Sequence, residues 1–122
     1  MIVAGFGFTS RATVDSLSQA LAATGYDGPI GKIATAHDKV AHPAILDLAR
    51  THGWRIEAVP PSALEAAMTE TQSLTSRLTR RTGSVAEASA LAGAGKDPTL
   101  IVTRQISHDR MATCAIAEGP DT

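Results

Sequence analysis

The feature that most constrains the fold is an alternation of short apolar runs with segments of helical periodicity. Strand-like runs occupy residues 2–4, 30–36 and 55–59. Between them, residues 14–21 and 43–49 place apolar side chains on one face of a helix. Strands that alternate with helices over short connections are typical of an α/β domain with a largely parallel sheet.

The expected ends of these helices carry the residue types that helix ends prefer. The first helix shows an apolar stripe at i, i+3 and i+7, formed by Val14, Leu17 and Leu21. Gly25 is expected to end that helix, because glycine adopts the left-handed conformation that closes many helices. Pro43 suits the first position of the second helix, and Gly53 is expected to end it.

The second half of the chain predicts two more helices and a hairpin. Residues 62–65 and 84–87 both fit the capping-box pattern Ser-x-x-Glu, which predicts helices that open at Ser62 and Ser84. Residues 69–82 are rich in Thr, Ser and Arg, and we expect a loop with a short helical piece there. Strands at residues 100–102 and 111–117 are close enough in sequence to pair as an antiparallel hairpin.

Together these elements predict a three-layer α/β/α domain with a mostly parallel five-stranded sheet that ends in an antiparallel hairpin. The chain has 122 residues, of which 43% are hydrophobic, and this suffices for one core. We expect residues 1–117 to form a single domain and residues 118–122 to be a flexible tail.

Composition removes several functional classes. A formal net charge of −1 provides no basic surface for nucleic acid. The sequence has no long uncharged apolar run for a membrane span and no basic segment of the kind that opens a signal peptide. The lone Cys114 excludes an internal disulfide and suits a reducing compartment. We therefore expect a cytoplasmic protein.

Ligands of open α/β sheets bind beyond the carboxyl ends of the strands, so the loops there are the candidate sites. The run Gly5-Phe6-Gly7 resembles the opening of a dinucleotide fingerprint, although Ser10 stands where a third glycine belongs. The alternatives are a tight strand-to-helix turn, or an anion site of backbone N–H groups with Arg11 nearby.

Two further segments are candidates. His37, Asp38 and Lys39 follow the second strand, where lysine can bind an anion and histidine can exchange a proton; a solvated loop is the alternative. Gly83 and Ser84 open a predicted helix, whose N-terminal N–H groups can also hold an anion.

Other chemistry finds little support in the sequence. The histidines show no spacing typical of paired zinc ligands, so we expect neither a metal nor a cofactor. Cys114 falls within a predicted strand and is interpreted as a small core residue.

The order of these motifs carries a family resemblance. Gly5-Phe6-Gly7 is followed by residues 33–35 with Lys39, then by residues 83–88, and then by residues 101–104 with Thr113. This succession resembles the cobalamin-biosynthesis family of CobE and the C-terminal domain of CbiG, over nearly the whole chain.

The chain departs from the family pattern at several positions. Phe8 and Ala86 stand where the family motifs carry cysteine, so thiol chemistry is not expected to be essential. His37 stands at a usual aspartate and Arg104 at a usual lysine, whereas Thr113 matches.

The resemblance implies a protein of cobalamin biosynthesis that binds a precorrin or related corrin intermediate, as accessory factor or carrier. It also implies other pathway enzymes as partners. Precorrins carry many carboxylates, and a cleft that binds them would be edged by Gly5, Gly7, Arg11, Lys39, Gly83, Ser84, Arg104 and Thr113.

Two alternatives stay open at this stage. The longer CbiG relatives are hydrolases that open the lactone ring of cobalt-precorrin-5A and release acetaldehyde. A hydrolase or related enzyme would use His37 or Glu87 as its general base. A small regulatory or nucleotide-binding module would depend on Gly5-Phe6-Gly7 alone.

Overall fold

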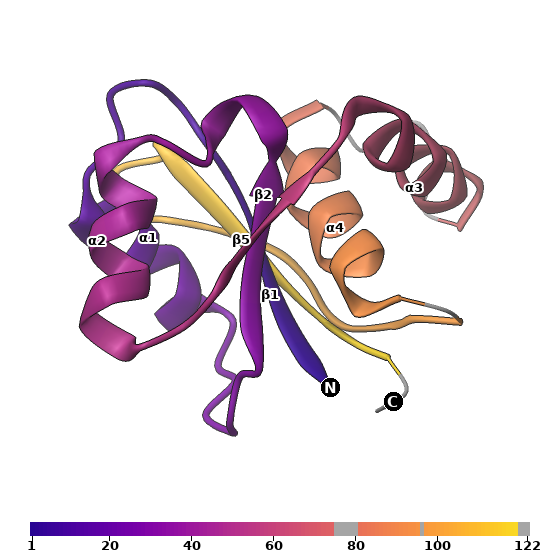
Figure 1. The fold of residues 1–122 in the computed structure, drawn as a ribbon, viewed down its shortest axis with the longest axis horizontal. Helices are drawn as coiled ribbons and strands as arrows, with labels where there is room; N and C mark the ends of the chain where they lie inside the picture. The colour runs from indigo at the N-terminus through magenta and orange to yellow at the C-terminus, as the bar shows by residue number, and fades with distance from the viewer. Residues whose placement is uncertain (75–80, 96, 120–122) are drawn as a thin grey trace.

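A computed structural model describes residues 1–74, 81–95 and 97–119 of the chain, and their side chains except at 68–74 and 81–84. Figure 1 shows a twisted sheet with helices on both faces. The predicted three-layer α/β/α architecture is confirmed. None of the helices within these described ranges has the length and hydropathy needed to cross a bilayer.

Within the described residues the sheet has five strands, in the spatial order β3-β2-β1-β5-β4. The three strands on one side of it are mutually parallel, and β5 runs antiparallel to both β1 and β4. The expected antiparallel hairpin is therefore present, and its second strand is inserted next to β1. The bounds are β1 Ile2–Phe8, β2 Lys32–Ala36, β3 Ile56–Val59, β4 Thr99–Ile106 and β5 Ala112–Glu118.

Four helices of the described part of the chain cover the sheet. In Figure 1, α1 and α2 lie on one face, while α4 lies on the other face with α3 outside it. A 3-10 turn, His37–Lys39, follows β2. The helix bounds are α1 Val14–Ala23, α2 Pro43–His52, α3 Pro61–Leu74 and α4 Arg81–Ala94.

The ends of α1 and α2 include the predicted Gly25, Pro43 and Gly53, together with a cap at Thr13 that was not predicted from the sequence. Thr13 caps α1 by accepting the backbone N–H of Ser16. Gly25 follows α1 with a φ of 72°, and Gly53 caps α2 with a φ of 73°, a conformation that suits glycine. Pro43 occupies the first turn of α2, as its position predicts.

The turn between β4 and β5 is fastened to the start of α1. The Ser16 hydroxyl donates to Oδ2 of Asp109 at 2.7 Å, and the Ser107 hydroxyl donates to Oδ1 at 2.6 Å. These bonds, with the Ser107 bond the largest contributor, lower the pKa of Asp109. The carboxylate also lies near the positive N-terminal end of α1, where negative charge is favourable.

Alternation along the strands sends successive side chains to opposite faces of the sheet. Ala4 and Phe6 belong to the core under α1 and α2, whereas Val3 belongs to the core under α4. Gly5 lies against α4, where a Cβ atom would overlap the Ala86 carbonyl oxygen and stand 2.9 Å from the Ala90 Cα. Glycine is required here because the helix backbone touches the strand.

Two local predictions are wrong, and a third segment is more helical than expected in its described residues. The expected tight loop at Gly5-Phe6-Gly7 is part of β1, which continues to Phe8. The two capping-box serines are not N-caps, because α3 begins at Pro61, before Ser62, and α4 begins at Arg81, before Ser84. Residues 69–82, expected to be a loop with a short helical piece, are helical at 69–74 and at 81–82, and residues 75–80 lie outside the described residues.

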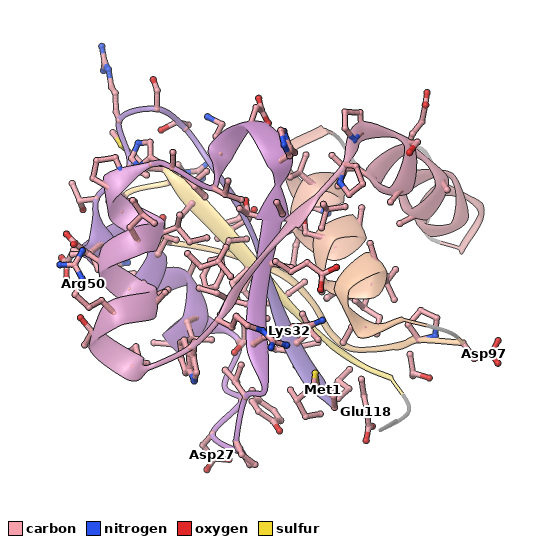
Figure 2. All side chains as sticks on the ribbon, in the orientation of Figure 1. Met1, Asp27, Lys32, Arg50, Asp97 and Glu118 are labelled. Carbon is pink, nitrogen blue, oxygen red and sulfur yellow. The ribbon has the colours of Figure 1, made fainter. Side chains whose placement is uncertain are left out.

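The last strand extends beyond the expected domain boundary. β5 continues to Glu118, and the backbone of Gly119 exchanges two hydrogen bonds with Met1, at 2.7 and 3.0 Å. Figure 2 shows Met1 and Glu118 near each other at one end of the sheet. These two residues of the predicted tail are thus held by the sheet, while residues 120–122 lie outside the described part.

Candidate functional site

A cavity of about 350 Å³ opens at the carboxyl ends of β1 and β2. This is the edge at which open α/β sheets bind their ligands. The strands β1 and β2 and the helices α3 and α4 contribute to its wall. The lining residues are Gly7, Phe8, Thr9, Thr35, Ala36, Asp38, Lys39, Leu64 and Val85.

The floor of this first cavity is braced by two threonine hydroxyls that donate to carbonyls of β1. Thr35 on β2 is fully buried, and its hydroxyl donates to the Phe6 carbonyl at 2.9 Å. On the opposite side of β1, the Thr113 hydroxyl donates to the Gly7 carbonyl at 3.2 Å. These bonds add to the backbone ladder and hold the end of β1 between its two neighbours.

Among the described lining residues the wall is mainly apolar, and Lys39 is their one cation. The Lys39 ammonium lies 5.5 Å from the centroid of the Phe8 ring, within the range of a cation–π contact. Lys39 forms no ion pair with a residue in the described part of the chain. It is therefore available to an anionic group that enters the cavity, with Asp38 as the neighbouring negative charge.

A second cavity of about 380 Å³ adjoins the first. Ala36, Asp38 and Leu64 line both cavities, so the two spaces share a wall. His37 borders the second cavity from the 3-10 turn after β2. The predicted polar cluster at residues 37–39 thus lies beside both cavities, with His37 and Asp38 exposed and Lys39 half-buried.

The structure brings only some of the sequence-predicted ligand residues to these cavities. Gly7 and Lys39 line the first cavity, whereas Thr113 does not line it and only donates its hydroxyl to the carbonyl of Gly7. Gly5 faces α4, and the exposed Arg11 lies in the loop after β1 without lining either cavity.

The predicted ligand residues Gly83 and Ser84 lie at the beginning of α4. Both fall in the first turn of this helix, and the side chain of Ser84 lies outside the described residues. Val85, the next residue, lines the first cavity, so the beginning of α4 borders it.

Glu87 and Arg104, the two remaining candidates, contact each other away from both cavities. Glu87 is 2% exposed, and its Oε2 accepts the backbone N–H of Arg104 on β4 at 3.1 Å. The other oxygen, Oε1, is buried and has no hydrogen-bond partner within the described part of the chain. Neither residue lines the first or the second cavity, which leaves Glu87 without access to a ligand bound there.

The structure also places Cys114 and the residue types that can bind a metal ion. Cys114 is fully buried in the core under α1 and α2, and burial raises the pKa of its thiol far above the ordinary value. The thiol therefore stays protonated and inert. Among the residues that the structure describes, no group of three His, Cys, Asp or Glu side chains is placed to hold a metal ion.

Sequence reasoning missed Phe8, Thr35, Leu64 and Val85 as lining residues. Phe8 and Thr35 stand at or near the carboxyl ends of two predicted strands, and this position is the signal that could have found them. Leu64 and Val85 reach the cavity because α3 and α4 pack beside each other, and that pairing has no local signature in the sequence.

The comparisons with known proteins agree with this architecture. The sequence model of a family described as "Cobalamin synthesis G C-terminus" matches residues 2–117. The chain belongs to this family. Its members take part in cobalamin biosynthesis, so the expected resemblance is confirmed.

Solved structures give the same result. Cobalamin biosynthesis protein ChiG from Agrobacterium tumefaciens is 30% identical, with a TM-score of 0.77, over 99% of this chain and 100% of that one. CobE, a protein of the cobalamin pathway, is 25% identical with a TM-score of 0.76, over 96% of this chain and 89% of that one.

A third structure shows the fold alone. It is described as a homolog of cobalamin biosynthesis protein G from Sulfolobus solfataricus, and it is 21% identical with a TM-score of 0.70. The match covers 95% of this chain and 36% of that one, so the fold also occurs within a longer protein. A search of curated protein sequences gave no match.

Proposed function

We propose that this member of the CbiG C-terminal family binds a precorrin or a related corrin intermediate, as an accessory factor or carrier in cobalamin biosynthesis. The observation that carries the proposal is the first cavity, where an apolar wall surrounds the Lys39 cation. A corrin ring offers the matching chemistry, since its broad apolar body is edged with acetate and propionate carboxylates.

The size of the site suits one edge of such a ring. Pockets that enclose a whole drug-sized ligand measure roughly 300–1,000 Å³, and a tetrapyrrole is larger than most such ligands. The first cavity, at about 350 Å³, has room for a ring edge with its carboxylate arm. The second cavity adjoins it across Leu64, which gives a neighbouring arm a place to lie.

The test is a titration of the protein with hydrogenobyrinic acid, followed by the absorbance of the ring. Lys39→Met is expected to weaken binding roughly 10- to 100-fold, because a hydrogen bond to a charged group contributes about 1.5–3 kcal/mol. Arg50→Met is the matched control, since it removes an exposed cation on α2 that pairs with Asp47. An unchanged spectrum at high micromolar ligand would overturn the proposal.

The second candidate is an enzyme of the same pathway, and the position of His37 favours it. His37 borders the second cavity, where it can act as a general base on a bound lactone or other ring substituent. Such an enzyme would turn over a lactone-containing precorrin, and His37→Ala would abolish the turnover while leaving binding intact. Equal turnover in His37→Ala would exclude this role.

A further inference from the structure

His42 uses both of its ring nitrogens, and each one bonds to a different part of the chain. Nδ1 accepts the backbone N–H of Ala44 at 3.1 Å, which makes His42 the N-cap of α2. Since Nδ1 is the acceptor, the ring proton of the neutral imidazole is on Nε2, which donates to the Ser10 carbonyl at 2.9 Å. The ring therefore joins the start of α2 to the loop after β1.

The same ring supports a wall of the first cavity. The centroids of His42 and Phe8 lie 5.1 Å apart with an interplanar angle of 75°, an edge-to-face geometry that ring pairs prefer. Phe8 lines the cavity and in turn lies under the Lys39 ammonium. The three side chains form a series of contacts that begins at α2 and ends at the cation in the cavity.

We propose that His42 is a positioning residue, which holds the Phe8 ring and through it the Lys39 ammonium at the wall of the first cavity. Without the imidazole, Phe8 loses its edge-to-face neighbour and the loop after β1 loses its bond at Ser10. The proposal rests on the proposed function only for the identity of the anion that Lys39 meets.

The arrangement can be measured without any ligand. The sequence has three lysines, at 32, 39 and 96, so methylation with ¹³C-formaldehyde gives few NMR signals and keeps the charge of each lysine. The Lys39 signal, assigned with Lys39→Arg, is expected to lie upfield because of the ring current of Phe8. Phe8→Leu should remove that displacement.

The decisive variant is His42→Asn. Asparagine is a good N-cap and retains an acceptor for the Ala44 N–H, so α2 keeps its first turn. It lacks the ring that contacts Phe8, and the Lys39 signal should therefore move at least halfway to its position in Phe8→Leu. A Lys39 signal that stays in place would overturn the proposal.

His52→Asn is the matched control, because it makes the same change at the other end of the same helix. The His52 ring stacks on Trp54 at a centroid distance of 4.1 Å and does not line the first cavity. The Lys39 signal should be unchanged in this variant. A displacement as large as that in His42→Asn would mean that any loss on α2 disturbs the site, and would also overturn the proposal.

A double-mutant cycle with hydrogenobyrinic acid separates positioning from general support of the fold. His42→Asn should weaken binding about 3- to 10-fold in the wild-type background and leave it unchanged when Lys39→Met is present, because coupled residues are not additive. Equal losses in both backgrounds would overturn the positioning role. If the wild-type protein binds no corrin, the proposed function fails, and the NMR result alone decides the role of His42.

Discussion

Beneath α1 and α2 the sheet is covered by large side chains, whereas most of the buried residues beneath α4 are alanine and glycine, with Val3, Val59 and Leu91 as the larger members. Fully buried side chains of the first face include Phe6, Leu17, Ile33, Ile45, Leu48 and Ile116. The second face includes Gly5, Ala34, Ala86, Ala90, Ala94, Ala115 and Ala117. The first core is filled by large side chains. The second core has small side chains, and the backbone of α4 packs close to the sheet instead.

The two faces should therefore be destabilised by opposite kinds of substitution. On the first face a deletion leaves a cavity, because the surrounding structure closes it only in part. On the second face an atom added at Gly5 has no space, because its neighbours are backbone atoms of α4 that cannot rotate away. The α4 face also forms part of the first cavity through Val85, so close packing there bears on the site as well as on stability.

The largest effect is expected for Gly5→Ala on the α4 face. The added methyl overlaps the backbone of Ala86 and Ala90, and we expect a loss of roughly 3 kcal/mol or more in the free energy of unfolding, at the upper end for overpacking. Urea unfolding measures it. Gly53→Ala is the control: its Cβ would meet nothing within 4 Å, and its φ of 73° alone should cost about 1–2 kcal/mol. Equal losses in the two variants would contradict close packing as the cause.

On the α1 and α2 face, Leu48→Ala should cost about 3 kcal/mol, because Leu48 is 1% exposed and its removal opens a cavity in the core. Thermal unfolding followed by circular dichroism measures this loss. Leu46→Ala on the same helix, where the side chain is 40% exposed, should cost less than about 1 kcal/mol. A small effect at Leu48 would show that this face tolerates deletions as well.

Neighbouring residues of β5 allow the comparison within one strand. Ala115 faces α4 and Ile116 faces α1 and α2. Ile116→Val removes one methylene and should cost about 1 kcal/mol, whereas Ala115→Val adds two carbons to the crowded face and should cost about 2 kcal/mol. Chemical denaturation of both variants gives the two values. The reverse order would mean that α4 can move away from the sheet.

The smallest effect is expected at Asp109, which fastens the β4–β5 turn to α1. Its pKa is lowered in the folded protein, so its contribution to stability is complete above the unfolded pKa of about 3.9 and is lost as the pH falls through the lower folded pKa. Asp109→Asn should therefore flatten the fall in melting temperature below about pH 4. A variant with the same acid dependence as the wild type would exclude this carboxylate as a contributor.

Local patterns predicted the elements whose ends depend on local chemistry. Pro43 and Gly53 delimit α2 as expected, and the apolar runs became strands. Glu87 shows where such reasoning stops. It fits a capping box with Ser84, yet its carboxylate bonds to Arg104, 17 residues away. A local motif cannot report that a tertiary partner competes for the same oxygen.

The candidate site was predictable to a similar extent. Lys39 could be placed at the cavity because it follows a predicted strand, and the rule for α/β sheets puts ligands there. The sequence places Gly5 in a ligand loop, although glycine is required there because the backbone of α4 touches it. A glycine motif indicates close approach, and only the tertiary structure shows whether a helix or a ligand makes it.

The place of β5 between β1 and β4 has a consequence for how the chain folds. β1 and β5 pair along their whole length, from Ile2 with Glu118 to Phe8 with Ala112, so the central ladder joins segments far apart in sequence. During synthesis, one edge of β1 stays open until residues 112–118 emerge. Contacts of such long range slow folding and leave an unpaired strand edge exposed to aggregation. The interval before β5 docks is therefore when the nascent protein is most vulnerable.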